Sequence, residues 1–453
     1  MAKPADDRKD VPKDSLDRFC NDELEVIFEF LPLQDCLRLE CLNRRVQKTI
    51  FTRAYVINAN SRMYWRGRYI DLRKIKSLLH KCCNAKNLIL PKHSVNPRDQ
   101  KRCLDFIQKY IKRLNYINIE VYRLLTTTKL TEAYTNKFIE KYKDSVIHID
   151  FTLSENLVFS TYPDFTSLKK LRSLCNVGLR HLSRFNQQRL TYLCLRLYRN
   201  DIEFFDEIKF TDFHRLQALR VELEPVGNYS TVKNLLAAIK DIKTLVHLTI
   251  TNRNALKFQR YMALNLPEYE TSLGALANNL SNLRKINCNI LIDEQSIRDM
   301  KSIYKNFEKF TNLNYLGLVI RFQVRLRYKH LRYGLMDLSG LNQLHSLTDL
   351  YLSFQPSFEP SFCLPIETIQ NISALFPNLI GLHIVTPICG TERLIEEIKQ
   401  LKCLRYLTVV LCNHMTDEFF QSVMKCCSEK IPKLIELNMV QDFDDLVPEI
   451  VNF

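Results

Sequence analysis

The chain has 453 residues, of which 46% are apolar and 25% are charged, and its formal net charge is +15 at pH 7. These proportions are ordinary for a folded protein, and no apolar run approaches the roughly 18 residues that a membrane-spanning helix needs. Residues 1–7 lack the apolar segment of a secretory signal, so we expect a cytoplasmic or nuclear protein. The positive charge is spread along the chain without a basic tail or a nucleic-acid motif, which favours first a well-solvated basic surface, next an acidic protein partner, and last DNA or RNA.

Residues 1–14 are charged and contain prolines, and we expect them to be disordered. A small helical module follows over residues 15–52. Four apolar residues have the i, i+3, i+4, i+7 spacing of an amphipathic helix: Leu24, Ile27, Phe28 and Leu31. Asn21 can cap this helix and Pro32 helps to end it, while Asp35 can cap a second helix. The apolar side of that second helix contains Cys36, Leu37, Leu39, Cys41 and Leu42.

Residues 53–80 are predicted to link this module to the rest of the chain. They contain the only tryptophan, Trp65, just before the segment 69–72, which is predicted to be a first irregular strand. We expect Trp65 to cover the open end of the following core, because terminal repeats of a stacked array are atypical. A binding role for Trp65 is the alternative.

About 12 to 13 copies of Leu-x-x-Leu-x-Leu fill residues 81–440. Clear copies begin at Leu190, Leu216, Leu245, Leu313, Leu347, Leu379, Leu404 and Leu434, and weaker copies at Ala85, Leu114, Val146, Leu171 and Leu283. The last two apolar positions alternate with a polar one, as in a short half-buried strand, and helical stretches such as 231–242, 366–375 and 394–401 lie between the copies. The pattern predicts an α/β solenoid of leucine-rich repeats, a curved horseshoe with parallel strands on its concave face and helices outside.

The residues between the repeated leucines should point into the concave face. The candidate substrate-binding residues there are Tyr192, Arg196, Tyr198, Arg220, Tyr315, Arg321, Arg325, Arg327, Tyr351 and Tyr406. Tyrosine and arginine dominate interface hot spots, although tyrosine is also common in strands for reasons of propensity alone. The same kind of position is occupied by Tyr116, His148, Asp150, His247, Lys285 and His383.

One repeat alternates for longer than the others, from Leu316 to Tyr328. An extended strand would align Arg321, Arg325 and Arg327 in a row suited to an acidic or phosphorylated segment. A looped-out hairpin with solvated charges is the alternative. After the last repeat, residues 441–453 form an acidic tail, which is either disordered or folded onto the basic inner surface.

Catalytic and metal-binding motifs are missing from the sequence. The 15 cysteines have no zinc-ligand spacing, and there is no phosphate-binding glycine loop, His-Glu-x-x-His or Gly-x-Ser-x-Gly. We therefore expect a non-catalytic protein without a cofactor, and no membrane partner.

The module at 15–52 resembles an F-box. The resemblance rests on Phe19, Leu24, Ile27, Phe28, Leu31, Pro32, Asp35, Leu39, Leu42, Arg44 and Arg45. Phe19-Cys20 replaces the family's usual Leu-Pro, and Val46 stands where a tryptophan is common. The repeat from Leu404 through Cys412 to Val423 also resembles the cysteine-containing leucine-rich repeat of F-box proteins.

This resemblance implies a substrate-recognition subunit of an SCF-type ubiquitin ligase. The F-box would bind the adaptor Skp1 and, through it, a cullin, while the solenoid would hold a protein substrate. The residues implied to contact Skp1 are Phe19, Leu24, Ile27, Phe28, Leu31, Pro32, Leu37 and Leu39. The alternatives are a leucine-rich-repeat scaffold outside any ligase and a basic protein that binds an anionic ligand.

Overall fold

The protein is described by a computed structural model that forms two compact units. The described residues are 19–20, 23–24, 26–27, 39, 56–58, 72–89, 99–117, 132–151, 164–197, 208–223, 229–252, 266–292, 300–322, 338–342, 344–356, 364–365, 371–389, 391–411, 421, 425 and 436–440. The first unit comprises 1–175 and 184–186, and the second comprises 176–183 and 187–453. No described helix is both long enough and apolar enough to span a bilayer.

The first unit alternates short strands with helices. Its elements are β1 (Val56–Asn58), α4 (Leu72–Lys81), β2 (Asn87–Ile89), α5 (Gln100–Tyr110), β3 (Tyr116–Ile117), α7 (Glu132–Tyr142), β4 (His148–Asp150) and the start of β5 (Ser173–Gly178). Each of these strands pairs in parallel with the next one. The buried Tyr142 hydroxyl donates to the carbonyls of Ile107 and Ile111, which fastens the end of α5 to α7.

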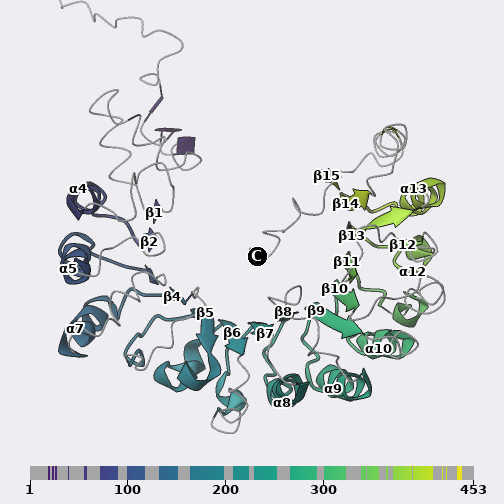
Figure 1. Cartoon of the computed structure of the whole chain (residues 1–453), viewed down its shortest axis with the longest axis horizontal. Coiled ribbons are helices and arrows are strands. Elements are labelled where there is room, and N and C mark those ends of the chain that lie inside the picture. The colour runs from purple at the N-terminus through teal and green to yellow at the C-terminus, as the bar shows by residue number, and fades with distance from the viewer. Residues whose placement is uncertain are drawn as a thin grey trace, which may run out of the picture. The chain divides into compact units, whose positions relative to one another are not determined.

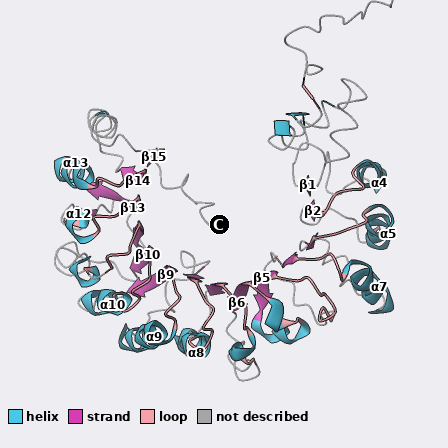
Figure 2. Ribbon diagram, turned by 180° about the vertical axis from the view of Figure 1, so that it is seen from behind, coloured by secondary structure: helices cyan, strands magenta, loops and turns pink. Residues whose placement is uncertain are grey.

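The second unit continues the alternation with longer strands. Its elements are β6 (Tyr192–Leu197), β7 (Ala218–Leu223), α8 (Tyr229–Ile239), β8 (His247–Asn252), α9 (Leu266–Asn279), β9 (Lys285–Ile292), α10 (Met300–Phe307), β10 (Tyr315–Phe322), β11 (Asp349–Pro356), β12 (Leu364–Pro365), α12 (Ile372–Leu375), β13 (Gly381–Cys389), α13 (Thr391–Gln400), β14 (Tyr406–Leu411) and β15 (Glu436–Val440). Short 3-10 turns include Leu179–Arg184, Gln187–Arg189, Phe210–Asp212 and Leu338–Leu341. Within this unit the described helices lie on one side of the strand row (Figures 1 and 2).

The repeated leucines align from strand to strand as the sequence predicts. One continuous register column of the second unit contains Leu193, Leu219, Leu248, Ile286, Leu316, Leu350, Leu382, Leu407 and Leu437. Leu316 and Leu350, in the middle of this column, are completely buried. A single strand cannot bury such a face, but a stack of parallel strands covered by helices can. This parallel, alternating architecture is consistent with a leucine-rich-repeat solenoid.

A ladder of polar side chains joins successive repeats. The residue before the first leucine of a repeat donates to a carbonyl of the preceding repeat: Thr244 to Leu216, Asn282 to Lys243, Asn312 to Ser281 and Ser346 to Leu313. These bonds satisfy backbone acceptors where the chain turns into each strand. The ladder fixes the spacing of repeats independently of the leucines.

In strand β5, the backbone conformation of one residue accounts for the missing third apolar residue of the repeat. Asn176 stands where that residue is expected and has a φ of 57°, in the left-handed region that asparagine tolerates better than most residues. Val177, one residue further along the strand, is fully buried instead. The pattern therefore shifts register by one residue within this strand.

Most of the predicted F-box lies outside the described residues. The described part shows a different helix cap from the expected Asn21: the Cys20 carbonyl accepts from the Leu24 backbone amide, so Cys20 is the capping residue. The Glu23 carboxylate in turn accepts from the Cys20 backbone amide at 2.7 Å, which lowers the pKa of Glu23. The Glu23 backbone amide donates back to Cys20 Sγ at 3.5 Å, and these two bonds form a capping box built around a cysteine.

The linker also differs from the prediction. The segment 69–72 is not a strand in its described part, because Leu72 begins α4, and the first described strand is β1. Trp65 lies outside the described residues. Among the predicted helices, 231–242 corresponds to α8, 394–401 to α13, and the end of 366–375 to α12.

Candidate functional site: the helix-free face of the second unit

The candidate site is the sheet face of the second unit opposite the described helices, called here the helix-free face. Its residues alternate with the buried leucines, and two continuous rows of them cross the strands. The first row is Tyr192, Ala218, His247, Lys285, Tyr315, Asp349, Gly381 and Tyr406, and the second is Cys194, Arg220, Thr249, Asn287, Gly317, Tyr351, His383 and Thr408. Because neighbouring strands are about 4.8 Å apart, adjacent members of a row touch.

An aromatic cluster occupies this face on β10, β11 and β13. Tyr351 is only 8% exposed and packs against Tyr315 and Val319. The ring of His383 lies 6.4 Å from that of Tyr351, and His383 Nδ1 is 2.9 Å from Thr408 Oγ1. The result is a preorganised surface of aromatic rings with polar edges, which is the composition of an interface hot spot.

Two glycines make room for this cluster. A Cβ atom at Gly317 would lie 3.0 Å from the Asn287 side chain and 3.2 Å from the Tyr315 ring. A Cβ atom at Gly381 would lie 2.5 Å from the Asp349 carboxylate. Side chains from adjacent positions thus lie across the glycine backbone, and a larger residue at either position would displace them.

Both tyrosines of the cluster stay protonated at neutral pH. Burial raises the pKa of Tyr315, and the neighbouring Tyr351 and Asp349 raise it further. Burial also raises the pKa of Tyr351, against a smaller opposite effect of a hydrogen bond with Ser353. The cluster therefore offers neutral hydroxyl groups and ring faces for binding.

The other end of the face, on β6 to β9, is basic. Arg220 Nη2 is 2.9 Å from Glu222 Oε1, and Arg196 lies opposite Glu222 in the register. The sequence predicts a solvated Arg196, but the side chain is buried, because the strand pattern gives its face and not its depth. Lys285 Nζ lies 5.9 Å above the ring of Tyr315 and so joins the basic end to the aromatic cluster.

The remaining predicted residues fall into three groups. Tyr192 is half-buried on the face and Tyr406 is 36% exposed at its far end. Arg321 lies on β10 in register with Gln355, and this strand extends to Phe322. Tyr198, Arg325 and Arg327 lie outside the described residues, and the acidic tail does too.

The predicted Skp1 contacts are described only in part. Leu24 is buried, whereas Phe19, Ile27 and Leu39 are half-buried. Phe28, Leu31, Pro32 and Leu37 lie outside the described residues.

Sequence reasoning did not select Glu222, Asn287 or Asp349 as site residues. Each occupies the same alternating position as a selected tyrosine or arginine, so the register alone could have found them. The selection by residue type missed the partners that position the tyrosines and arginines. No group of three or more His, Cys, Asp or Glu side chains in the described part of the chain is placed to hold a metal ion.

The corresponding face of the first unit carries a hydrogen-bonded polar cluster. The rings of Tyr116 and His148 stack with centroids 5.0 Å apart, and the Tyr116 hydroxyl donates to Asp150 at 3.3 Å. His148 Nδ1 is 2.5 Å from Ser173 Oγ. Burial lowers the pKa of His148 and outweighs the opposite effect of Asp150.

This cluster predicts a loss of stability in mild acid. The neutral His148 is favoured in the folded state, so the unfolded chain binds a proton more readily below the ordinary histidine pKa of about 6.5. The free energy of unfolding should therefore fall as the pH drops below about 6.5. His148→Gln should reduce this slope in urea titrations at pH 7.5 and pH 5.5. An unchanged slope would mean that other groups cause the acid sensitivity.

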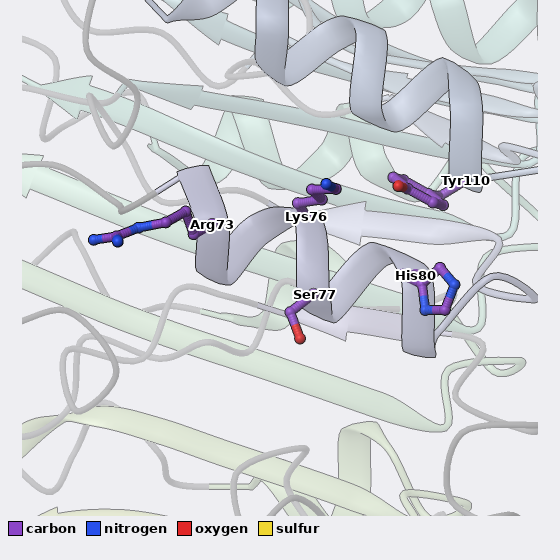
Figure 3. Close-up of a pocket in the computed structure, with 5 residues that line it drawn as sticks. All are labelled: Arg73, Lys76, Ser77, His80 and Tyr110. Carbon is purple, nitrogen blue, oxygen red and sulfur yellow. The ribbon is translucent and has the colours of Figure 1, made fainter.

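A basic hollow of about 510 Å³ lies on the helical side of the first unit. It is lined by Arg73, Lys76, Ser77, His80 and Tyr110. Figure 3 shows Lys76 and His80 near Tyr110, whereas Arg73 and Ser77 point away from that ring. The His80 and Tyr110 rings meet edge to face at 5.4 Å. The cations of this hollow diverge and are exposed to solvent, where salt screens their charges.

Comparisons with known proteins found a distant likeness among solved structures. No protein-family model matches the sequence, and no curated protein matches it either. Among solved structures, a chain of the crystal structure of the Rad7 and Elc1 complex in yeast is 14% identical, with 84% of this chain and 90% of that chain covered. The TM-score is 0.24, so this likeness does not establish a shared fold or partner.

Proposed function

We propose that this chain is the substrate-recognition subunit of an SCF-type ubiquitin ligase and has no catalytic activity of its own. Residues 15–52 bind the adaptor Skp1, and the helix-free face of the second unit binds the protein substrate. The observation that carries the proposal is the F-box-like sequence, including Leu24, Ile27 and Leu31-Pro32, on the N-terminal side of an array of leucine-rich repeats in register.

The chemistry of the helix-free face supports the substrate-binding half of the proposal. Preorganised aromatic rings on β10 and β11 lose little side-chain entropy when a partner binds. The basic end on β6 and β7 adds charge complementarity, which favours selection among partners. These are the properties of a protein-recognition surface.

The adaptor-binding half is tested by co-purification with Skp1. The full chain should retain Skp1, and Leu31→Asp combined with Pro32→Ala should abolish the association, because a carboxylate cannot be buried in an apolar interface without a large cost. Lys402→Gln, which changes an exposed turn before β14, is the matched control and should retain Skp1. The F-box assignment fails if the unaltered chain does not associate with Skp1, or if the double variant associates normally.

A further inference from the structure

A carboxylate lies within the aromatic cluster of the helix-free face. Asp349, the first residue of β11, stands in the first row between Tyr315 on β10 and Gly381 on β13. Its side chain lies over the Gly381 backbone, where a Cβ atom would be 2.5 Å from Asp349 Oδ1 and 3.3 Å from His383 Nε2. Tyr406 follows Gly381 in the row. The carboxylate therefore occupies the space left by the glycine, between two tyrosines of the row.

This carboxylate has no cationic partner in the part of the chain that the structure describes. Thr348 Oγ1 donates a hydrogen bond to Asp349 Oδ2 at 2.7 Å, and no described lysine, arginine or histidine forms an ion pair with Asp349. Asp349 is half-buried, and its Oδ1 is not among the described side-chain oxygens that are both closed to solvent and without a hydrogen bond. Oδ1 is therefore accessible to an incoming group. A partly desolvated charge without a partner costs stability, so folding alone does not explain a carboxylate at this position.

Aromatic rings border the carboxylate on the same face. Tyr315 is half-buried and Tyr406 is 36% exposed, so both present ring surface to a partner. After burial and the neighbouring Tyr351, the Asp349 charge contributes to the raised pKa of Tyr315, as expected of a carboxylate close to the phenol. Ring faces attract cations, and Lys285 on β9 already lies 5.9 Å above the Tyr315 ring. The combination of ring faces and a carboxylate is suited to a positively charged group.

We propose that Asp349 binds a lysine or arginine side chain of the protein substrate, with the rings of Tyr315 and Tyr406 in contact with that side chain. This inference rests on the proposed function, in which the same face holds the substrate. An ammonium or guanidinium group donates charge-assisted hydrogen bonds to a carboxylate and also gains from adjacent aromatic rings. Since the other end of the face is basic, a bound substrate would place its cation at β11 and its acidic residues toward β6, which fixes its direction on the face.

The test probes a peptide array with the labelled full chain. Each spot fixes one central residue, which is lysine, arginine, glutamine or glutamate, and its flanks are mixtures of uncharged residues. The lysine or the arginine spots should retain about tenfold more chain than the glutamine spots, and the stronger of the two identifies the cation. Equal retention on the cationic and glutamine spots, or the strongest retention on the glutamate spots, would overturn the proposal.

Asp349→Asn separates the charge of the carboxylate from the shape of the site. The side chain keeps its size and loses its charge, so the preference for the cationic spots should fall below about twofold. Glu396→Gln, at an exposed position of α13, is the matched loss of one negative charge and should keep the full preference. A preference that survives Asp349→Asn, or that Glu396→Gln removes to the same extent, would refute binding at Asp349.

Gly381→Ala tests the position of the carboxylate while its charge is unchanged. The added methyl group would displace Asp349 Oδ1, so the preference should fall as it does in Asp349→Asn. Circular dichroism checks that both variants are folded, and Asp349→Asn decides the question if Gly381→Ala does not fold. Array binding needs no Skp1, so a failure of the F-box assignment would leave this result readable. Conversely, loss of the cation preference would leave the association with Skp1 intact.

Discussion

Leu316→Ala is expected to lower the free energy of unfolding by about 3 kcal/mol. Leu316 is completely buried on β10, with Ile286 and Leu350 beside it in the leucine column. Truncation removes apolar contacts on both sides and leaves a cavity that the rigid parallel strands cannot close. Urea denaturation followed by circular dichroism measures the change.

The matched control for this variant is Lys305→Ala on the adjacent helix α10. Lys305 is exposed, and its truncation should change the free energy of unfolding by less than about 0.5 kcal/mol. Each repeat contacts chiefly its neighbours, so the loss at Leu316 should act mainly on β9 to β11. A change at Leu316 below about 1 kcal/mol would contradict its place in the core.

The strand register was predictable from the sequence because one physical requirement determines it. An apolar residue at every second position must face the helices, and a shift by one residue would expose the whole column. Leu193, Leu219 and Leu248 therefore align as their spacing requires. The left-handed conformation of Asn176 could not be predicted in this way, because a single such residue inside a strand leaves no periodic signal in the sequence.

The site was predictable only in outline. Alternation placed Tyr315, Tyr351 and Arg220 on the helix-free face, because successive residues of a strand point to opposite sides of the sheet. It could not give the burial of Arg196, which depends on Glu222 and other groups brought beside it by the neighbouring repeats. The Cys20 cap was missed for a related reason: a thiol is a rare capping group, and asparagine at the next position looked more suitable.

Tyr351→Ala is expected to weaken substrate capture by about thirtyfold, the effect of a hot-spot residue worth about 2 kcal/mol. Tyr351 is the most buried ring of the aromatic cluster and packs against Tyr315 and Val319, so its truncation would release the more exposed Tyr315 ring that a partner can contact. Affinity capture followed by quantitative mass spectrometry should show the same proteins lost from Tyr351→Ala and retained by Tyr351→Phe, which keeps the ring.

Two further measurements separate recognition from folding. Skp1 association should be equal in all the tyrosine variants, because residues 15–52 are unchanged. Tyr406→Ala, at the more exposed end of the same face, should weaken capture by less than about fivefold, because rim residues contribute less than desolvated central ones. If Tyr351→Ala and Tyr315→Ala both capture the full set of proteins, the substrate binds elsewhere than on the helix-free face. The leucine-rich repeats would then support a substrate-binding surface on another part of the chain.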